Sequence, residues 1–268
     1  SFDTRSLGLF RITLGLTLLL DLYLRSRVLV SFYINSGLLP NHTLLWAPPS
    51  RYMFSLLFTA STPLDAAVGM ALCGLAFLLL TLGYHTKLAQ FASLIAVVSL
   101  NSRIAPLENG GDMVTSGVCI WALFLPLGER FSVDAVLASL RWRSEDAPAE
   151  LNDRAALRPP LTRERAYSLA CLGLILQFFF VYLFNALHKN GPTWLSGDAV
   201  HYTLHQDRIV RWAGVWLREN APVELLRALT WGTIATEFLG AAAILSPIAT
   251  RYTRAFAVLV MPLMHAGF

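Results

Sequence analysis

The stretch that decides the fold runs from Gln177 to Trp194 and reads QFFFVYLFNALHKNGPTW. Its apolar first half is typical of a membrane-spanning helix, and Gly191 and Pro192 then end that helix. Lys189 stands where the apolar helix meets the membrane interface. An ionisable residue there is costly unless it snorkels, pairs with a partner or faces a cavity. We therefore treat Lys189 as the first candidate for a membrane-embedded chemical site.

The composition indicates an integral membrane protein. Of the 268 residues, 55% are hydrophobic and 14% are charged, and the mean hydropathy is +0.54. A soluble domain carries about 25% charged residues. The net charge of +4 comes from basic residues that are scattered among loops and form no groove-sized cluster. Nucleic acid is therefore excluded as a partner, and membrane lipid is expected.

Seven apolar runs, separated by turn or charge signals, predict an all-α polytopic bundle of about seven transmembrane helices with almost no strand. The runs are Leu7–Leu29, Pro63–Gly83, Lys87–Ile104, Met113–Leu127, Ala166–His188, Leu225–Leu245 and Ala255–Phe268. At least six should cross the membrane. The last run is shorter than the roughly 20 residues of a span. Residues 1–268 are therefore expected to form a single membrane domain that is a fragment of a longer chain.

The distribution of Lys and Arg favours a cytoplasmic N-terminus. In that orientation the Arg-rich connection Arg130–Arg165, which includes Arg154, Arg158 and Arg163, lies inside and gives that side a small excess of basic residues. The segments Asn109–Asp112 and Trp194–Asn220, together with Lys189, then lie on the outer face. A site built from all three would open away from the cytoplasm.

Arg11 and Asp21 lie within the first predicted span, and Glu237 lies near the middle of the sixth. Each charge alone costs about 2.5–3.5 kcal/mol on insertion scales, so each needs a partner or water. We expect Arg11 to form an ion pair with Glu237 or Asp21. Such a pair favours a structural role, holding helices in register, over direct chemistry.

Tyr182, Asn185 and Lys189 are spaced i, i+3 and i+7, so they share one stripe of a helix and are expected to point inward together. A lysine desolvated against an apolar helix can lose its proton and act as a general base. The alternative is that Lys189 snorkels to the headgroups. His265, in the last apolar run, is either a packing residue or a second acid or base.

Two further patterns carry weaker signals. In Asn109-Gly-Gly-Asp112 the glycines allow a tight turn, and Asp112 can cap the next helix and hold a polar or cationic partner, as a plain loop or as a site wall. His201 and His205 have the i, i+4 spacing of paired metal ligands, but the sequence offers no third ligand. No metal site is therefore predicted, and an interfacial helix with histidine and aromatic anchors is the preferred interpretation.

The order of five short blocks resembles a known family. They are Leu7-Gly-Leu-Phe-Arg11-Ile, Asn109-Gly-Gly-Asp, Leu125-Pro-Leu-Gly with Phe131-Ser-Val-Asp, Asn185-Ala-Leu-His-Lys189, and Trp194 with Gly197. In this order they resemble the vitamin K-dependent gamma-carboxylase-like membrane domain, also called the horizontally transferred transmembrane (HTTM) domain. The resemblance covers most of the chain.

The resemblance implies a chemistry. In the carboxylase a lysine at the place of Lys189 deprotonates a reduced quinone, vitamin K hydroquinone, which reacts with oxygen to give a strong base. That base removes the gamma proton of a glutamate, and carbon dioxide adds to the carbanion. The resemblance thus implies Lys189 and His265 as catalytic residues, and Asn109, Asp112, Tyr182, Asn185 and Trp194 as the substrate or quinone wall. It also implies a bacterial plasma (inner) membrane.

The sequence departs from the family in two respects. Where the animal enzyme has a histidine in its asparagine-rich loop, this chain has Gly111 or Asp112, and no soluble peptide-recruiting domain is present in these residues. Quinol- and oxygen-linked chemistry on an unknown substrate therefore stands beside two alternatives. One is a non-carboxylating maturation factor for a secreted peptide, and the other is an accessory subunit of a larger membrane complex.

Overall fold

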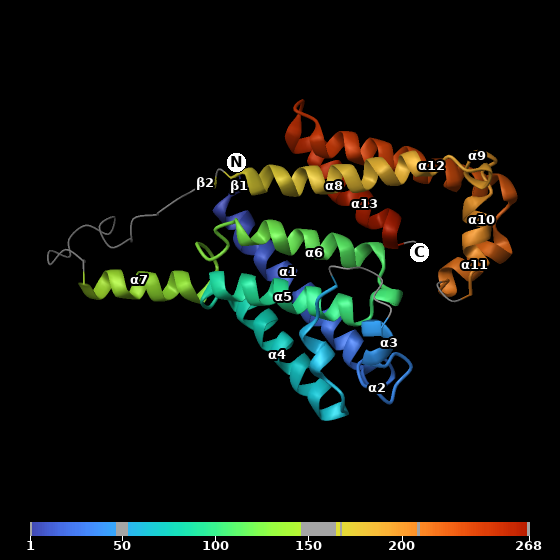
Figure 1. The fold of residues 1–268 in the computed structure, drawn as a ribbon. Helices are drawn as coiled ribbons and strands as arrows, with labels where there is room; N and C mark the ends of the chain where they lie inside the picture. The colour runs from blue at the N-terminus through green and yellow to red at the C-terminus, as the bar shows by residue number, and fades with distance from the viewer. Residues whose placement is uncertain (1, 47–52, 146–164, 167, 208–209, 267–268) are drawn as a thin grey trace. The chain divides into compact units, whose positions relative to one another are not determined.

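The computed structural model describes residues 2–46, 53–145, 165–166, 168–207 and 210–266 (Figure 1). The described chain is predominantly helical, as expected, and its strand structure is one antiparallel pair, β1 (Phe2–Asp3) with β2 (Arg165–Ala166). The predicted loop positions Arg154, Arg158 and Arg163 lie outside the described residues. The chain divides into two compact units, Ser1–Cys171 and Leu172–Phe268.

Unit 1 is built on four helices that pack in succession, α1 against α4, α4 against α5, and α5 against α6 (Figure 1). Their bounds are α1 Thr4–Ser26, α4 Pro63–Leu82, α5 Thr86–Arg103 and α6 Gly110–Leu123, and between them lie α2 Leu29–Phe32, α3 Asn41–Trp46, η1 Leu56–Thr59 and η2 Ala105–Leu107. Helix α7, Val133–Glu145, follows α6.

Local sequence signals set the ends of α4. Thr62 and Asp65 form a reciprocal capping box, and Pro63 occupies the first turn, where a missing N–H costs nothing. The helix stops at Gly83, whose φ of +69° is a left-handed conformation that a glycine adopts without strain. Within the packed pair, a Cβ at Gly15 of α1 would collide with Thr81 of α4. The small residue therefore allows these two helices to approach closely.

Helix α5 differs from its neighbours because its buried side is polar. Gln90, Ser93, Ser99 and Asn101 are all at most 6% exposed. The amide of Gln90 donates to the carbonyl of Ala122, near the end of α6, where helix carbonyls lack intrahelical partners. Helix α5 therefore forms hydrogen bonds inside unit 1, and the polar residues that form them lower its mean hydropathy.

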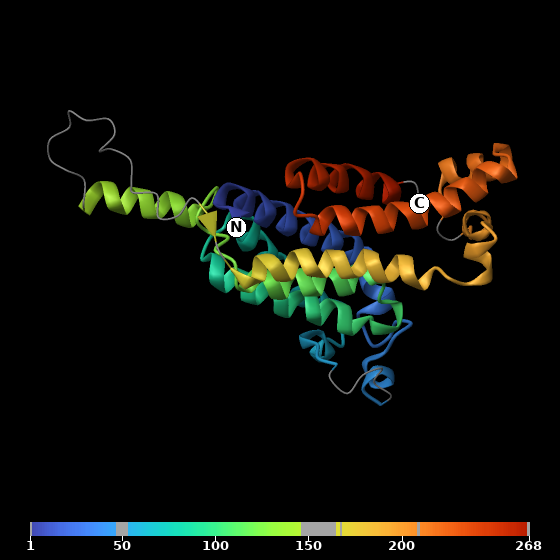
Figure 2. The same cartoon turned by 90° about the horizontal axis from the view of Figure 1, so that it is seen from above.

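Unit 2 contains α8 (Leu169–His188), α9 (Pro192–Leu195), α10 (Ala199–Leu204), α11 (Trp212–Asn220), α12 (Val223–Leu245) and α13 (Thr250–Ala266). Helix α13 packs along α12 (Figure 2), and a Cβ at Gly240 would collide with Met261. The short helices meet α12 at a small apolar cluster of Val200, Leu204 and Leu226.

The structure supports four of the seven expected spans. Each of the seven predicted runs contains a helix, and among the described residues four helices are long and apolar enough to cross a membrane, namely α1, α4, α8 and α12. Helix α6 has 14 residues, a length of roughly 21 Å at 1.5 Å per residue, against about 30 Å of hydrocarbon. Helix α5 has 18 residues, but its polar residues make it less hydrophobic than a membrane-spanning helix. The protein is membrane-associated through at least these four apolar helices.

Candidate functional site

Lys189 lies directly after the last residue of α8, where its side chain forms an ion pair with Glu237 of α12. The Lys189 Nζ is 2.6 Å from Glu237 Oε2, and the two side chains are 16% and 4% exposed. The same ammonium is 3.4 Å from the backbone carbonyl of Asn185 and 5.1 Å from the centre of the Trp194 ring, a cation–π distance. Lys189 is therefore held inside unit 2 and does not extend into solvent, which argues against simple snorkelling.

A second polar contact lies on the same helices. Tyr182 Oη of α8 and His265 Nε2 of α13 are 3.3 Å apart, within hydrogen-bond distance, and the two rings are tilted with centres 6.0 Å apart. The Glu237 carboxylate lies near enough to Tyr182 to act on it electrostatically. The structure therefore gathers Tyr182, Lys189, Glu237 and His265 into one polar group, which we call the Lys189 cluster.

One part of the predicted stripe is wrong. The Asn185 side chain is exposed, and only its backbone oxygen reaches Lys189. The reason is geometric: the helix ends at His188, so Lys189 turns back over the last carbonyls and no longer follows the helical stripe. Tyr182 contacts His265, whereas Lys189 contacts Glu237.

The predicted ion pair of Arg11 is also wrong. Arg11 is fully buried, and its Nη2 donates to the backbone carbonyl of Phe131 at 2.5 Å. Asp21 is bound by Arg25, one helical turn away on α1, at 2.7 Å, while Glu237 pairs with Lys189. This carbonyl satisfies one donor of the guanidinium, while Arg11 Nε and Nη1 are buried without a hydrogen-bond partner among the described residues.

Asn109 and Asp112 behave as the sequence indicated, in unit 1. The Asn109 side chain accepts from the N–H groups of Gly111 and Asp112, and the Asp112 side chain accepts from the N–H of Asn109, a capping box that starts α6. Asp112 Oδ1 also lies 2.6 Å from Arg25 Nη2. Asp112 thus both caps its helix and holds a cation.

Arg25 is the residue that sequence reasoning missed. It lies in the last turn of α1, is 7% exposed, and donates to Asp21, Asp112 and Asn101. Its Nη1 also approaches the Tyr33 hydroxyl at 3.5 Å. Burial raises the pKa of Tyr33 although Arg25 acts in the opposite direction, so Tyr33 is a neutral partner. The i, i+4 spacing of Asp21 and Arg25 was the available signal.

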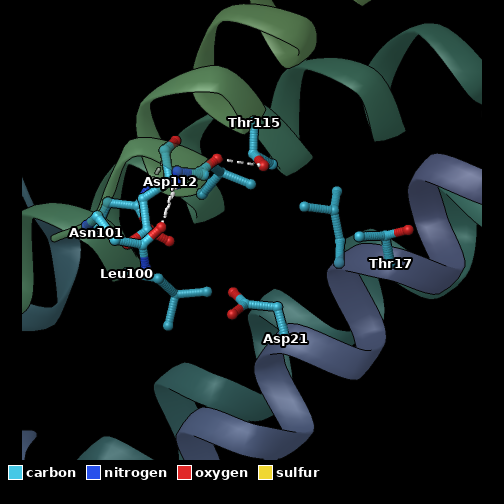
Figure 3. A pocket seen from close by; sticks show the side chains of 10 residues that line it. Thr17, Asp21, Leu100, Asn101, Asp112 and Thr115 are labelled. Atoms are coloured by element: carbon cyan, nitrogen blue, oxygen red, sulfur yellow. Dashed lines mark hydrogen bonds between the residues drawn. The ribbon is translucent and has the colours of Figure 1, made fainter. Parts of the chain in front are cut away.

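A cavity of about 230 Å³ lies beside this network, between α1, α5 and α6 (Figure 3). Its polar lining comes from Thr17, Asp21, Asn101, Asn109, Asp112 and Thr115. Figure 3 shows the Asp21 carboxylate facing the hollow from α1, across from Asn101 and Asp112. Two of the predicted wall residues, Asn109 and Asp112, therefore line a cavity in unit 1, while Tyr182, Trp194, Lys189 and His265 gather in unit 2.

The rings of His201 and His205 are tilted by 44° with centres 4.4 Å apart, and His205 Nδ1 lies 2.8 Å from the His201 carbonyl oxygen. In the part of the chain that the structure describes, no group of three or more His, Cys, Asp and Glu residues is placed to hold a metal ion. This pair is a local contact at the end of α10.

Compared with protein-family models, with curated proteins and with solved structures, the chain matches none of them.

Proposed function

We propose that this protein is a vitamin K-dependent gamma-carboxylase-like enzyme of the HTTM family, in which Lys189 acts as a base toward a reduced quinone. The observation that carries the proposal is the buried contact of 2.6 Å between Lys189 Nζ and Glu237 Oε2, next to Tyr182 and His265. The family, the quinone, oxygen and carbon dioxide enter through the resemblance, and the substrate is open. We place the protein in a bacterial plasma membrane with its N-terminus in the cytoplasm.

Glu237 gives Lys189 a way to act as a base. A buried ion pair gains little net stability over an apolar pair of similar volume, so stability alone is weak grounds for this one. Passing one proton from Lys189 Nζ to Glu237 Oε2 leaves the net charge of the pair unchanged. The resulting free amine can accept a proton from a phenolic hydroxyl, and the ammonium that forms stays beside Glu237.

The side chains around Lys189 fit an aromatic diol. The Trp194 ring offers a flat apolar surface beside the ammonium, and Tyr182 and His265 offer polar groups that can donate to or accept from a ring hydroxyl. When bound, the reduced quinone supplies the reaction with oxygen that the resemblance implies. The residues of the chain bind and orient the ring and move its proton.

His265 has the second acid–base role in the proposal. Its ring is exposed while Glu237 is 3% exposed, and Tyr182 lies beside both. A proton taken up at Lys189 can therefore leave toward the exposed imidazole, a side chain that can both accept and donate a proton. Roles for Asn109, Asp112 and Asn185 in quinone binding stay predictions.

The experiment is oxygen uptake by the purified protein in detergent, measured with reduced menaquinone and ubiquinone analogues. We expect quinol-dependent uptake that His265→Ala slows more than His201→Ala, because His201 belongs to α10 and is not part of the Lys189 cluster. A wild type that consumes no oxygen with any quinol contradicts the enzyme proposal. Co-purification with one partner at constant stoichiometry would then identify an accessory subunit or a maturation factor.

A further inference from the structure

We propose that the cavity of unit 1 binds a small organic cation, a protonated amine carried on a short apolar body. This inference is independent of the proposed function, since it concerns residues of α1, α5 and α6 only. The cavity volume of about 230 Å³ is below the roughly 300–1,000 Å³ of pockets for drug-sized ligands, and it exceeds the roughly 30 Å³ of one water molecule. The ligand is therefore small but larger than an ion with its water.

The charges around the cavity leave one negative charge uncompensated. Asp21 and Asp112 both line it, and the single guanidinium of Arg25 bridges them at 2.7 and 2.6 Å. The nearest further cation on α5, Arg103, lies over the Tyr33 ring, donates to the Leu39 carbonyl and does not line the cavity. An occupant with one positive charge would balance the site.

Among the described residues that line the cavity, Asp21 has a carboxylate oxygen that accepts no hydrogen bond. Both oxygens of Asp112 are engaged, one by Arg25 and one by the N–H of Asn109. The oxygen of Asn101 accepts from Arg25, and its amide donates to Ser116 and to the Asp112 carbonyl. Among the described residues, Asp21 receives one hydrogen bond, at Oδ2, which leaves Oδ1 free.

The position of Asp21 favours a ligand there over contact with lipid. Asp21 lies within α1, one of the membrane-spanning helices, and its side chain is 44% exposed. An ionised carboxylate facing hydrocarbon is strongly disfavoured, whereas a polar cavity accepts it. Figure 3 shows its oxygens directed into the hollow.

The other residues that line the cavity favour a ligand with an apolar carbon skeleton. Leu18, Val97 and Leu100 line the cavity, and the hydroxyls of Thr17 and Thr115 are already donated to backbone carbonyls of their own helices. An ammonium group at Asp21 would therefore place its carbon skeleton against these side chains. A ligand of this kind combines one charge-assisted hydrogen bond with apolar contact.

The test uses two probes of nearly equal shape, phenethylamine and 2-phenylethanol, with the purified full chain in detergent and calorimetric titration. We expect the amine to bind about tenfold or more tightly than the alcohol, the ratio for one charge-assisted hydrogen bond. Asp21→Asn should remove this preference. The matched control is Asp207→Asn, an 84% exposed aspartate that also pairs with an arginine, and it should leave the preference intact.

If Asp21→Asn fails to fold, Val97→Phe tests the same site by filling its apolar wall while leaving Asp21 in place. That variant should lose amine binding. The proposal is overturned if the wild type binds no amine, if the alcohol binds as tightly as the amine, or if amine binding survives both substitutions. Equal binding of the alcohol would instead indicate a neutral hydroxyl ligand.

Discussion

Removing the carboxylate of Glu237 should destabilise unit 2 through the charge it leaves behind. In Glu237→Gln the Lys189 ammonium stays in a site where it is 16% exposed, with the Asn185 carbonyl and the Trp194 ring as its remaining partners. Breaking a buried pair on one side costs about 3–5 kcal/mol, and the residual contacts recover about 1 kcal/mol. We expect a loss of about 2–4 kcal/mol.

A double-mutant cycle isolates this effect. Lys189→Met alone strands the Glu237 carboxylate and should also cost at least about 2 kcal/mol. The double variant Lys189→Met/Glu237→Gln removes both charges and should cost about 1.5 kcal/mol, so the coupling energy should be at least about 2.5 kcal/mol. The assay is reversible unfolding in mixed micelles, with the exposed pair Asp207–Arg218 as control, where Asp207→Asn should change stability by less than about 0.5 kcal/mol. A coupling energy near zero for Lys189 and Glu237 would refute the reasoning.

Three further predictions concern unit 1, each checked by the unfolding midpoint in detergent. Asp112→Ala removes a helix cap and a partner of buried Arg25, so it should cost about 3 kcal/mol or more, and an unchanged midpoint would contradict the network. Gly83→Ala places a Cβ against Arg11 at positive φ, so it should cost more than the roughly 1 kcal/mol of the backbone conformation alone; a smaller loss would show that Arg11 moves freely. For Asp134, burial raises the pKa, but hydrogen bonds from the side chain and backbone of Thr86 and the N–H of His85 outweigh it, and the pKa lies below the ordinary 3.8. The ionised carboxylate of Asp134 therefore stabilises the fold above pH 3.8, and this contribution is lost as the pH falls below that value. The loss of stability between about pH 5 and about pH 3 should be smaller in Asp134→Asn than in the wild type.

Local patterns predicted much of this fold. Each predicted span contains a helix, and the capping box of Asn109 and Asp112 follows from residue types at fixed spacing. A helical pattern alone does not distinguish a spanning helix from an internal one. The buried polar residues Gln90 and Asn101 of α5 donate to carbonyls of α6, and only the packed structure shows that those partners exist.

The partners of the charged residues could not be predicted from the sequence. Arg11, Asp21, Glu237 and Lys189 could each be recognised as residues that need partners, but a partner is chosen by geometry between distant segments. The prediction that Arg11 pairs with an acid was wrong, because its Nη2 donates to the backbone carbonyl of Phe131. Arg25 was missed because two of its partners, Asn101 of α5 and Asp112 of α6, are far from it in the sequence.

The measurement that tests the central claim most directly compares the two lysines of this chain. Lys87 donates to the carbonyls of Leu123 and Leu125 in unit 1, whereas Lys189 pairs with Glu237. Purified Lys189→Ala and Lys87→Ala are assayed for quinol-dependent oxygen consumption, with folded yield checked by gel filtration. A base at Lys189 predicts that Lys189→Ala loses at least about 100-fold in rate, the lower range for general base catalysis, while Lys87→Ala keeps activity in proportion to its folded yield. Quinol-dependent oxygen consumption at the wild-type rate in folded Lys189→Ala would contradict the claim.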